Sequence, residues 1–329
     1  MKIFVSGATG FIGSRLIREL SSRGNTIHAL YRDEEKAERI KDSNIRLFKG
    51  DILSKESIMK AVEGCDQIYH VAAFAKVWTK EHSKIYRLNI EGAMNVIHSG
   101  IQAGVKKMVI TSTAGVFGPS NNKKVDEKVR PDEFFIDYES SKYLLERAID
   151  AICAEGSNIV VVNPTRVFGP GLLNDGNSVT KMIYGYYRGS WRMIPGNGKG
   201  VGNYVFVDDV IQGHILAMEK GRPGERYILG GDDISYNDFF RILGDHTGRK
   251  RIMLKIPLFL ILFLSRIMIA LARMTGSNPM ITPGLVKKFY HDFRVSSRKS
   301  IDELGYEPVS IEDGIRKTLD WLNAYKRIK

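Results

Sequence analysis

The chain has 329 residues, of which 43% are hydrophobic, and a formal net charge of +12 at pH 7. This length and composition are typical of a soluble globular protein with an ample core and exclude collagen-like and disordered chains. Nucleic acid attracts basic proteins, but no recognition motif or basic helix with interleaved aromatic residues is present, so we expect no nucleic-acid partner. Cys65 and Cys153 are far apart and lack metal-ligand spacing, which indicates a reduced cytoplasmic protein without a metal.

Short β-rich runs alternate with amphipathic stretches from the first residues onward, and the first apolar run is too short for a signal peptide. Strands are predicted at 2–6, 26–31, 45–51, 66–73, 106–113 and 158–164. Helices are predicted at 11–24, 33–41, 55–64, 81–103 and 138–156. The alternation predicts an α/β fold of the Rossmann type, a doubly wound parallel sheet covered by helices on both faces.

After Pro164 the pattern breaks into glycines and turn signals, with a helix expected at 178–189. Further strands are predicted at 203–210 and 226–231 with a helix at 208–220 between them, and the tail from 235 is mostly helical. We therefore expect a dinucleotide-binding domain over 1–168, to which 203–231 returns. A smaller, mostly helical C-terminal substrate-binding region is then formed by 169–202 and 232–329.

The segment SGATGFIG (6–13) places Gly7, Gly10 and Gly13 between the first strand and the first helix. Such a turn lets backbone N–H groups approach a pyrophosphate at the positive end of the helix. Glycine is needed there because a Cβ would block the approach or because φ is positive. The spacing is G-x-x-G-x-x-G and not the dinucleotide fingerprint G-x-G-x-x-G, so an incidental glycine turn is the alternative.

The end of the second strand distinguishes the two nicotinamide cofactors. An acid there would hold the ribose 2′-hydroxyl of NAD, but this chain has Tyr31 followed by Arg32. A guanidinium suits a phosphate, so the sequence favours NADP and leaves NAD possible. The alternative is that Arg32 only caps a solvated turn, and Asp33 beside it weakens the phosphate interpretation.

The segment YESSK places Tyr138 and Lys142 on one helix face at i and i+4. A carbonyl reduced by hydride needs a proton on its oxygen, and a phenol can supply it, although its free pKa is about 10. The Lys142 ammonium and the positive nicotinamide of an oxidised cofactor would lower that pKa. Thr113 would hydrogen-bond the substrate oxygen and orient it.

Several motifs follow one another in an order that resembles the extended short-chain dehydrogenases/reductases, the NAD-dependent epimerase/dehydratase superfamily. They are SGATGFIG, GDI (50–52), HVAA (70–73), NIEGAMNV (89–96), TSTAGVFG (111–118), YxxxK (138–142) and NPTRVFGPG (163–171). VFVDDV (205–210) and ELGYEPVSIEDGIRKTLDWL (303–322) extend the resemblance almost to the end of the chain. The resemblance implies an NAD(P)-dependent oxidoreductase.

The resemblance also implies a role for each matching residue. The catalytic set is Tyr138, Lys142 and Thr113, with Asn89 completing a proton relay. The cofactor set comprises Gly7, Gly10 and Gly13 at the pyrophosphate with Phe11 and Ile12 beside it, Arg32 at the 2′-phosphate, Asp51 and Ile52 flanking the adenine, Ala72, Ala73 and Thr111 along the cofactor, and Pro164 and Val167 at the nicotinamide. Thr113 replaces the serine of many members but keeps the hydroxyl, and Ser6 replaces a more usual threonine.

Two features favour the branch of dihydroflavonol reductases and 3β-hydroxysteroid dehydrogenases over nucleotide-sugar epimerases and dehydratases. The latter often carry an Arg-Asp pair that grips the diphosphate just before V-D-D, and here that pair falls at Gly202-Asn203. The second feature is Tyr31-Arg32 in place of an acid. The closest resemblance is to bacterial dihydroflavonol-reductase-like proteins, which include those called hopanoid-associated sugar epimerases.

Two alternatives stay open at this point. One is a nucleotide-sugar epimerase or dehydratase with tightly held NAD. The other is a regulatory protein that senses NADP, which the intact Thr113, Tyr138 and Lys142 disfavour. The resemblance also leaves a homodimer through helices of the sheet domain open.

The segment KIPLFLILFLSRIMIALARM (255–274) is apolar without interruption from Ile256 to Leu264, and Arg266 and Arg273 follow. The run is too short for a membrane span of about 20 residues. A buried or lid helix over the substrate pocket is the first prediction. A helix lying on a membrane surface is the alternative, because no acidic residue occurs between His246 and His291. Both interpretations predict an apolar small-molecule substrate. The second also predicts a cytoplasmic enzyme that is peripheral to the membrane.

The substrate pocket has three further candidates. Phe74 and Trp78 follow the HVAA segment, and Met193 lies in the substrate region, although such residues also build cores. His70 lies within a strand and is expected to be structural.

Overall fold

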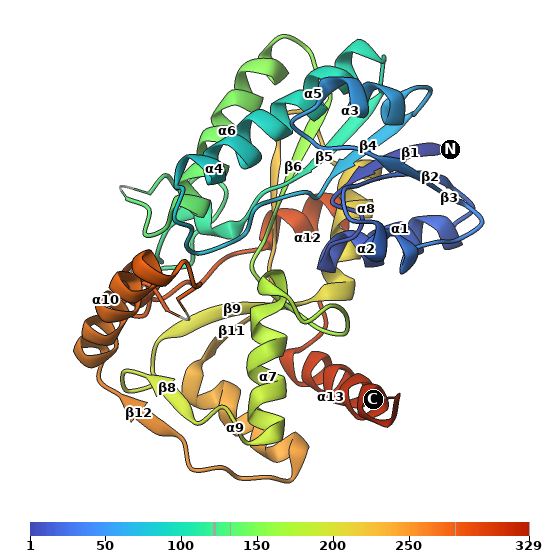
Figure 1. Cartoon of the computed structure of the whole chain (residues 1–329). Helices are drawn as coiled ribbons and strands as arrows, with labels where there is room; N and C mark the ends of the chain where they lie inside the picture. Colours follow the sequence, from blue (N-terminus) through green and yellow to red (C-terminus); the bar gives the residue numbers. More distant parts are fainter. Residues whose placement is uncertain (121–122, 132, 280, 329) are drawn as a thin grey trace.

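A seven-stranded sheet forms one half of the molecule in the computed structural model, which describes residues 1–120, 123–131, 133–279 and 281–328 (Figure 1). The strand order is β10-β6-β5-β4-β1-β2-β3, and every neighbouring pair is parallel. The strands are β1 (Lys2–Ser6), β2 (Thr26–Tyr31), β3 (Ile45–Lys49), β4 (Gln67–His70), β5 (Lys107–Thr111), β6 (Ile159–Pro164) and β10 (Arg226–Leu229). The predicted doubly wound parallel sheet is confirmed, and its order reverses between β1 and β4.

Helices cover both faces because the strands are apolar on both sides. In β1, Phe4 belongs to one buried cluster, whereas Ile3 and Val5 belong to the other. The Phe4 face is covered by α3 (Lys55–Val62), α5 (Gly92–Gln102) and α6 (Asp137–Ala154). The opposite face is covered by α1 (Phe11–Ser22), α8 (Val207–Lys220) and α12 (Arg298–Leu304). A short helix, α2 (Glu34–Glu38), follows β2.

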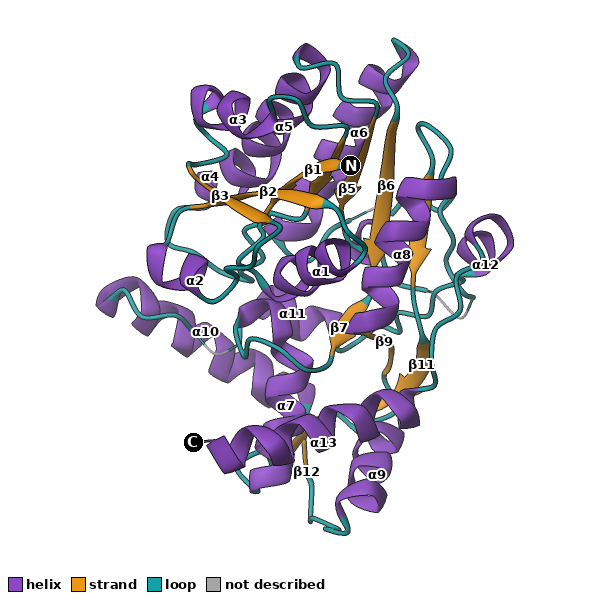
Figure 2. Ribbon diagram, turned by 90° about the vertical axis from the view of Figure 1, so that its right-hand side faces the viewer, coloured by secondary structure: helices purple, strands orange, loops and turns teal. Residues whose placement is uncertain are grey.

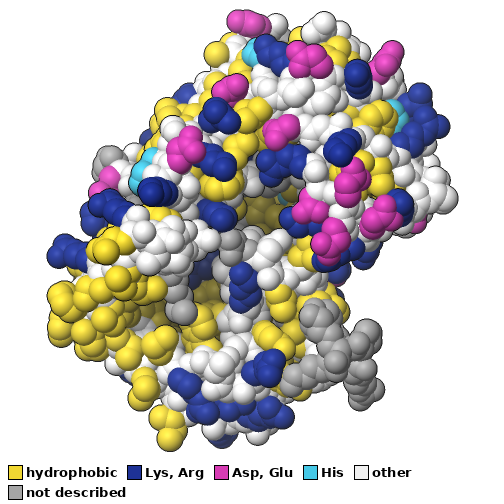
Figure 3. Space-filling model, viewed as in Figure 1, with side chains coloured by type: hydrophobic (Ala, Val, Ile, Leu, Met, Phe, Trp, Pro, Cys, Tyr) yellow, Lys and Arg dark blue, Asp and Glu magenta, His cyan; other side chains and the backbone are white. Residues whose placement is uncertain are grey.

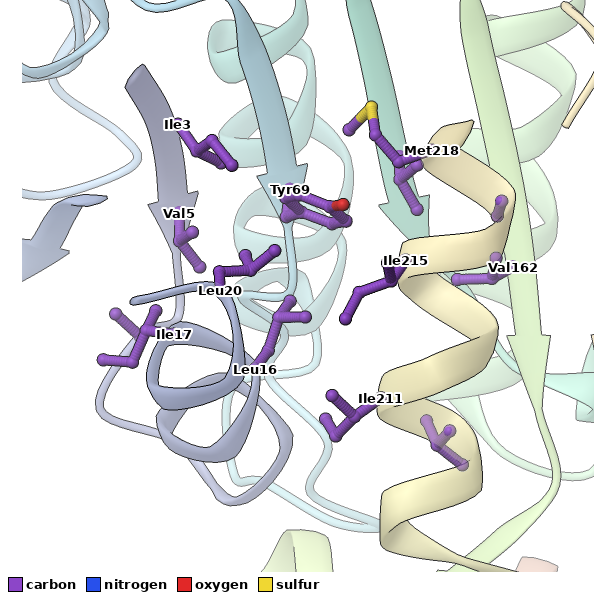
Figure 4. Packing of buried hydrophobic residues seen from close by; sticks show 14 of the residues in the cluster. Ile3, Val5, Leu16, Ile17, Leu20, Tyr69, Val162, Ile211, Ile215 and Met218 are labelled. Atoms are coloured by element: carbon purple, nitrogen blue, oxygen red, sulfur yellow. The ribbon is translucent and has the colours of Figure 1, made fainter. Parts of the chain in front are cut away.

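Figure 4 shows how α1 and α8 fill the second face. Leu16 and Leu20 of α1 and Ile215 of α8 point between the strands toward Tyr69 of β4. These side chains are at most 3% exposed, and full burial of one such side chain stabilises the fold by about 1.5–3 kcal/mol. The packing anchors the start of α1, where the glycine turn lies.

Several predicted elements end differently in the structure. The strands predicted at 66–73 and 106–113 stop at His70 and Thr111, so the residues after them leave the sheet at its carboxyl edge. The single helix predicted at 81–103 consists of α4 (Ser83–Tyr86), a π-helical turn (Arg87–Glu91) and α5. A 3₁₀ turn (Ala114–Phe117) follows β5.

The C-terminal part is built on two small sheets (Figure 2). One has the order β11 (Asp232–Ser235), β9 (Val201–Phe206), β7 (Arg166–Phe168), and the other pairs β12 (Leu254–Ile256) with β8 (Met193–Pro195). Its other elements are a 3₁₀ turn (Asp175–Asn177), α7 (Ser178–Arg188), α9 (Tyr236–Thr247), α10 (Leu258–Thr275), α11 (Pro283–Lys288) and α13 (Ile311–Ile328). The chain crosses between the two parts repeatedly, since α8 and β10 join the large sheet, β7 and β9 join the small one, and α12 packs on α8.

Helix α10 lies at the outer edge of the molecule and is not buried, so the buried form of the predicted buried or lid helix is wrong (Figure 1). Within it only Ser265 and Ala272 are buried. Seven of its large apolar side chains are between 39% and 83% exposed, namely Phe259, Leu260, Phe263, Leu264, Ile267, Leu271 and Met274. Among the described residues α10 is the one helix long and apolar enough, by length and composition, to cross a membrane. The helix packs on α11, and nothing in the described chain covers its outer face.

Candidate functional site

The glycine turn between β1 and α1 is closely packed against the loop that follows β4. Gly7 has φ +75°, and a Cβ there would lie 2.5 Å from the backbone nitrogen of Ala72. A Cβ on Gly13 would lie 2.1 Å from the carbonyl oxygen of Gly7. Neither position accepts a side chain, because the obstructing atoms belong to backbone. The glycines therefore hold the turn in one tight conformation.

The N-terminus of α1 is available to an anion. Gly10 is its N-cap residue and supplies no side-chain hydrogen bond, and its own N–H donates to the Gly7 carbonyl at 2.9 Å. A helix of 12 residues begins here, and its first N–H groups lack intrahelical acceptors. Phe11 is buried, and Ile12 packs against the cores of both parts of the molecule. This turn fits the pyrophosphate of a dinucleotide through backbone donors and the helix dipole.

Arg32 and Asp51 lie opposite each other beyond the ends of β2 and β3. The Arg32 Nη1 and the Asp51 Oδ2 are 3.4 Å apart, and the two side chains are 65% and 39% exposed. An exposed ion pair contributes about 0–1 kcal/mol, so the pair opens easily. Tyr31 is engaged instead with Glu34, and that hydrogen bond raises the pKa of Tyr31. Because its pair with Asp51 is exposed and weak, the Arg32 guanidinium can also meet a further anion at this edge of the sheet.

Lys142 is fully buried within α6, and its ammonium is held by the end of β5. Its Nζ donates to the Thr111 carbonyl oxygen at 2.8 Å. Burial lowers the pKa of Lys142 to about 8, and the Glu146 carboxylate opposes that shift. The Thr111 hydroxyl is occupied by the ring of His214 at 2.8 Å. Lys142 is therefore a positioned cation that can lose its proton close to physiological pH.

Tyr138 lies one helical turn before Lys142, and the structure describes no hydrogen-bond partner for its hydroxyl. Burial, and then the Glu139 carboxylate, raise the pKa of Tyr138 above its ordinary value. Lys142 does not reverse this shift in the protein alone, and the lowering predicted for the complex with an oxidised nicotinamide stays a prediction.

Thr113 follows β5 and caps the 3₁₀ turn. Its Oγ1 accepts from the Gly115 N–H at 3.2 Å, and its carbonyl accepts from the Asn163 side chain at 3.2 Å. Because the hydroxyl oxygen accepts that bond, its own proton is available to a substrate oxygen.

Asn89 is fully buried in the π-helical turn and joins two segments of the site. Its Oδ1 accepts from the Phe74 N–H at 2.7 Å, and its Nδ2 donates to the Ser141 Oγ at 3.0 Å. The side chain thus ties the loop after β4 to α6. Its described contacts include neither Tyr138 nor Lys142, so the proton relay stays a prediction.

The remaining predicted cofactor residues border the carboxyl edge of the sheet. Ile52 follows Asp51 and meets α5, where a Cβ on Gly92 would lie 2.6 Å from its Cδ1. Ala72 faces the glycine turn and Ala73 is exposed beside it. Pro164 ends β6, and Val167 lies partly buried in β7.

A cleft of about 640 Å³ opens beside the first turn of α6. Asp137 and Ser140, on either side of Tyr138 in the chain, both line it. Figure 3, drawn from the same side as Figure 1, shows the surface hollowed between the two parts of the molecule. The other lining residues are Val77, Trp78, His82, Tyr86, Glu133, Phe134, Phe135, Ile136, Ile269, Arg273, Thr282, Pro283 and Gly284.

The three predicted substrate residues have different environments. Trp78 lines the cleft. Phe74 is partly buried, and the ammonium groups of Lys76 and Lys84 each lie 5.9 Å from its ring centre. Met193 is 47% exposed on β8 and is not among the residues around the cleft.

The sequence reasoning missed a polar group on the cleft wall. The His82 Nδ1 lies 2.5 Å from Asp137, and the Tyr86 hydroxyl lies 2.8 Å from the Ser140 Oγ. It also missed the ion pair between Glu139 and Lys288, which joins α6 to α11 beneath the cleft. No pattern marks these pairs because their members are 54 to 149 positions apart in the chain.

A family model and two related proteins match this sequence. The sequence model of the NAD-dependent epimerase/dehydratase family matches residues 3–230. Sterol demethylase protein B of Methylococcus capsulatus is 28% identical over 98% of both chains. Dihydroflavonol 4-reductase of Gerbera hybrida is 30% identical over 78% of this chain and 75% of its own.

Solved structures share the fold over the full length. The crystal structure of gox2253 is 30% identical, with a TM-score of 0.83 over 99% of both chains. UDP-glucose 4-epimerase of Thermotoga maritima, solved with UDP-glucose, is 24% identical with a TM-score of 0.81 over 100% of both chains, a likeness of fold alone. Both comparisons support the fold described above.

Proposed function

The chain belongs to the NAD-dependent epimerase/dehydratase family, and we propose that within it this protein is an NADP-dependent oxidoreductase acting on a ketone or secondary alcohol of a small, apolar substrate. The observation that carries the proposal is the pair on α6. The Tyr138 hydroxyl has no hydrogen-bond partner among the described residues, and Lys142 is a fully buried cation one turn later. Both lie at the carboxyl edge of the sheet, where doubly wound folds bind ligands.

When bound, the nicotinamide supplies or accepts the hydride. Gly7, Gly10 and Gly13 hold the pyrophosphate with the N-terminus of α1. The Thr113 hydroxyl donates to the substrate oxygen and orients it. Tyr138 gives or takes the proton on that oxygen, and Lys142 supplies positive charge below it.

The first test is cofactor oxidation by the purified protein. NADPH and NADH are supplied in turn with flavanonols, ketosteroids, acyl ketones and keto-sugar nucleotides, and the Tyr138→Phe variant is run in parallel. We expect NADPH turnover with an apolar ketone, which the variant loses by a factor of about 10²–10⁴. Turnover that survives in Tyr138→Phe would remove the phenol from the mechanism.

The preference for NADP rests on Arg32. Substituting Arg32→Ala removes the guanidinium that is proposed to meet the 2′-phosphate, so the KM for NADPH rises on the order of tenfold while that for NADH changes little. The control is Arg39→Ala on the neighbouring surface. An equal change for both cofactors would contradict the assignment of the 2′-phosphate to Arg32.

The family also contains nucleotide-sugar enzymes, and they form the second candidate. NAD that co-purifies tightly, with no NADPH turnover, would favour an epimerase or dehydratase. Full biological function of the Tyr138→Phe variant would instead favour an NADP-sensing protein.

We propose further that segment 255–274 makes peripheral contact with a membrane. Figure 3 shows hydrophobic side chains gathered over α10, and the sequence from His246 to His291 contains eight lysines and arginines and no acid. An apolar face with a basic surround fits an anionic lipid surface. The helix does not suit a span, since β12 before it pairs with β8 and Lys288 after it pairs with Glu139, so both ends are tied to the same folded body.

Vesicle sedimentation tests this contact. We expect binding to phosphatidylglycerol vesicles that weakens with salt and falls at least tenfold in a Phe259→Ser/Phe263→Ser variant. Ile301→Ser, which changes an exposed apolar residue on α12, is the matched control. Resistance to carbonate extraction would indicate a span, and a change of mass without a change of vesicle binding would indicate that α10 joins two copies of the chain.

A homodimer through the sheet domain is a separate proposal. Ile101 of α5 and Leu144 of α6 are 44% and 47% exposed, which supports an apolar contact on these helices. Light scattering of the wild type and of Leu144→Asp distinguishes a dimer from a monomer.

A further inference from the structure

Helix α10 forms part of the cleft wall as well as the exposed apolar surface. Ile269 and Arg273 both line the cleft that opens beside the first turn of α6. Residues four apart are neighbours on a helix, so these two side chains share one face of α10. The cleft and the proposed lipid surface are therefore built on the same helix.

The exposed apolar side chains of α10 lie directly beside the face that lines the cleft. Phe263, Ile267 and Leu271 follow one another at intervals of four residues, and all three are exposed. Arg266 is exposed too, three residues after Phe263 and three before Ile269, so it lies between this apolar row and the cleft. A helix with its side chains is about 10–12 Å across, so the cleft wall lies within one helix diameter of the apolar row.

A second part of the cleft wall also carries exposed apolar and basic groups. Val77 and Trp78 line the cleft, and Val77 is 38% exposed. The ammonium groups of Lys76 and Lys84 belong to the same segment and lie over the Phe74 ring. Figures 1 and 2 both show α4, which contains Lys84, on the same side of the molecule as α10. One surface can therefore meet both segments.

Two hydrogen-bonded side-chain pairs of the cleft lie at α6, beside Tyr138. His82 pairs with Asp137, and Tyr86 pairs with Ser140. All four side chains line the cleft, and Asp137 and Ser140 lie on either side of Tyr138 in the chain. The cleft thus offers polar partners at α6 and the apolar Ile269 side chain at α10. An amphiphile whose polar end reacts at α6 and whose apolar body extends along α10 matches this order.

We propose that the cleft takes its substrate directly from the bilayer on which α10 lies, through a mouth between α10 and the segment that contains Val77 and Trp78. The inference rests on the proposed function, because it joins the proposed membrane contact to the cleft beside Tyr138. The substrate class becomes a bilayer-resident lipid with a ketone or hydroxyl at its polar end. Passage along an apolar surface spares its apolar body from contact with water. Anionic head groups are attracted by the basic residues around the mouth, namely Lys76, Lys84, Arg266 and Arg273.

Fluorescence quenching tests the position of the mouth without knowledge of the substrate. The chain has three tryptophans, and Trp191→Phe/Trp321→Phe leaves Trp78 as the reporter at the mouth. The vesicles contain phosphatidylglycerol and a brominated phosphatidylcholine, which quenches tryptophan at short range. We expect Trp78 to lose emission on these vesicles. The control is Trp78→Phe/Trp191→Phe, because Trp321 lies on α13, on the other side of the molecule from α10, and should keep its emission (Figure 1).

Transfer of a bilayer-resident probe tests the route. Dehydroergosterol is a fluorescent secondary alcohol that accepts energy from tryptophan, and it is offered to the protein with Trp78 alone in phosphatidylglycerol vesicles or as a cyclodextrin complex. We expect Phe259→Ser/Phe263→Ser to take up the probe from vesicles about tenfold more slowly, with unchanged affinity for the probe from cyclodextrin. Ile269→Glu changes the cleft wall, so it should weaken probe binding from both sources while vesicle sedimentation stays unchanged.

The outcomes separate this proposal from those on which it rests. An unquenched Trp78 on vesicles that do sediment with the protein overturns it, as does equal uptake from vesicles by the wild type and by Phe259→Ser/Phe263→Ser. Absence of probe transfer from either source overturns it as well. Neither readout requires hydride transfer, so failure of the proposed oxidoreductase is reported separately by NADPH oxidation and Tyr138→Phe. Failure of the membrane contact is reported by sedimentation alone, and unchanged NADP binding shows that the variants are folded.

Discussion

At the scale of single residues, the structure depends on glycines, which have no side chain, as much as on residues that have one. A Cβ on Gly13 would collide with the Gly7 carbonyl oxygen, and a Cβ on Gly202 would collide with the Arg166 guanidinium. In both places hydrogen in place of Cβ lets a polar group approach closely. The chemistry at α6 depends on one buried charge, the Lys142 ammonium.

Substituting Gly13→Ala places a Cβ 2.1 Å from the Gly7 carbonyl oxygen. The turn has to shift, which costs about 1–3 kcal/mol of unfolding free energy and weakens dinucleotide binding at least tenfold. Urea unfolding and cofactor titration measure the two effects. Gly200→Ala is the control, because its nearest neighbour would be 3.7 Å away. Wild-type cofactor affinity in Gly13→Ala would contradict the proposed position of the pyrophosphate.

The lowered pKa of Lys142 predicts that the affinity for a dinucleotide depends on pH. Its pKa falls from 10.5 to about 8 in the folded protein because of burial. Dinucleotide binding should therefore weaken as the pH rises through about 8, where Lys142 loses its charge. We expect this pH dependence to be absent in Lys142→Met and to move to higher pH in Lys142→Arg. Between pH 8 and 10.5 the lysine binds more protons in the unfolded chain than in the folded protein, so the unfolding free energy rises with pH in this range. The loss of dinucleotide affinity is therefore not caused by unfolding. A pH-independent Kd up to pH 10 would contradict this prediction.

At the scale of elements, the site is a junction between α6 and the C-terminal helices. Gly284 of α11 packs directly on the Phe135 carbonyl, where a Cβ would lie 2.2 Å away. Helix α10 adds Ile269 and Arg273 to the cleft while its outer face stays exposed. The arrangement of these helices therefore decides the shape of the cleft, and α10 brings the proposed lipid surface close to its entrance.

The ion pair between α6 and α11 predicts a large and specific loss of stability. Glu139 is 4% exposed and Lys288 16% exposed, so Glu139→Gln leaves a nearly buried ammonium without its partner. We expect a loss of about 3 kcal/mol of unfolding free energy, measured by urea denaturation. Asp302→Asn, which breaks the exposed pair with Arg298, should cost no more than about 1 kcal/mol. Similar losses in the two variants would show that burial does not matter here.

At the scale of the whole molecule, the two parts are interleaved. Helix α8 and strand β10 return to the large sheet after β9, and α12 returns again near the end of the chain. Ile12 and Val167 pack against both large clusters. Neither part can complete its core without chain from the other.

Heat should therefore unfold the protein in one transition. We expect a single calorimetric peak whose calorimetric and van't Hoff enthalpies agree, and a fragment of residues 1–168 that does not fold. NADP at 100 times its Kd should raise the unfolding free energy by about 2.7 kcal/mol without splitting the peak. Two resolved transitions would show that the parts are separate folding units.

Local pattern determined the parallel sheet, the glycine turn and the pair Tyr138 and Lys142, because each is written in neighbouring residues with a fixed period or spacing. Tertiary structure decided what lies between distant segments. It placed Arg166 over Gly202, joined Glu139 to Lys288 and turned α10 outward, since these contacts join residues with no shared pattern. It also decided that burial raises the pKa of Tyr138 in the protein alone, because burial depends on the whole fold whereas spacing does not.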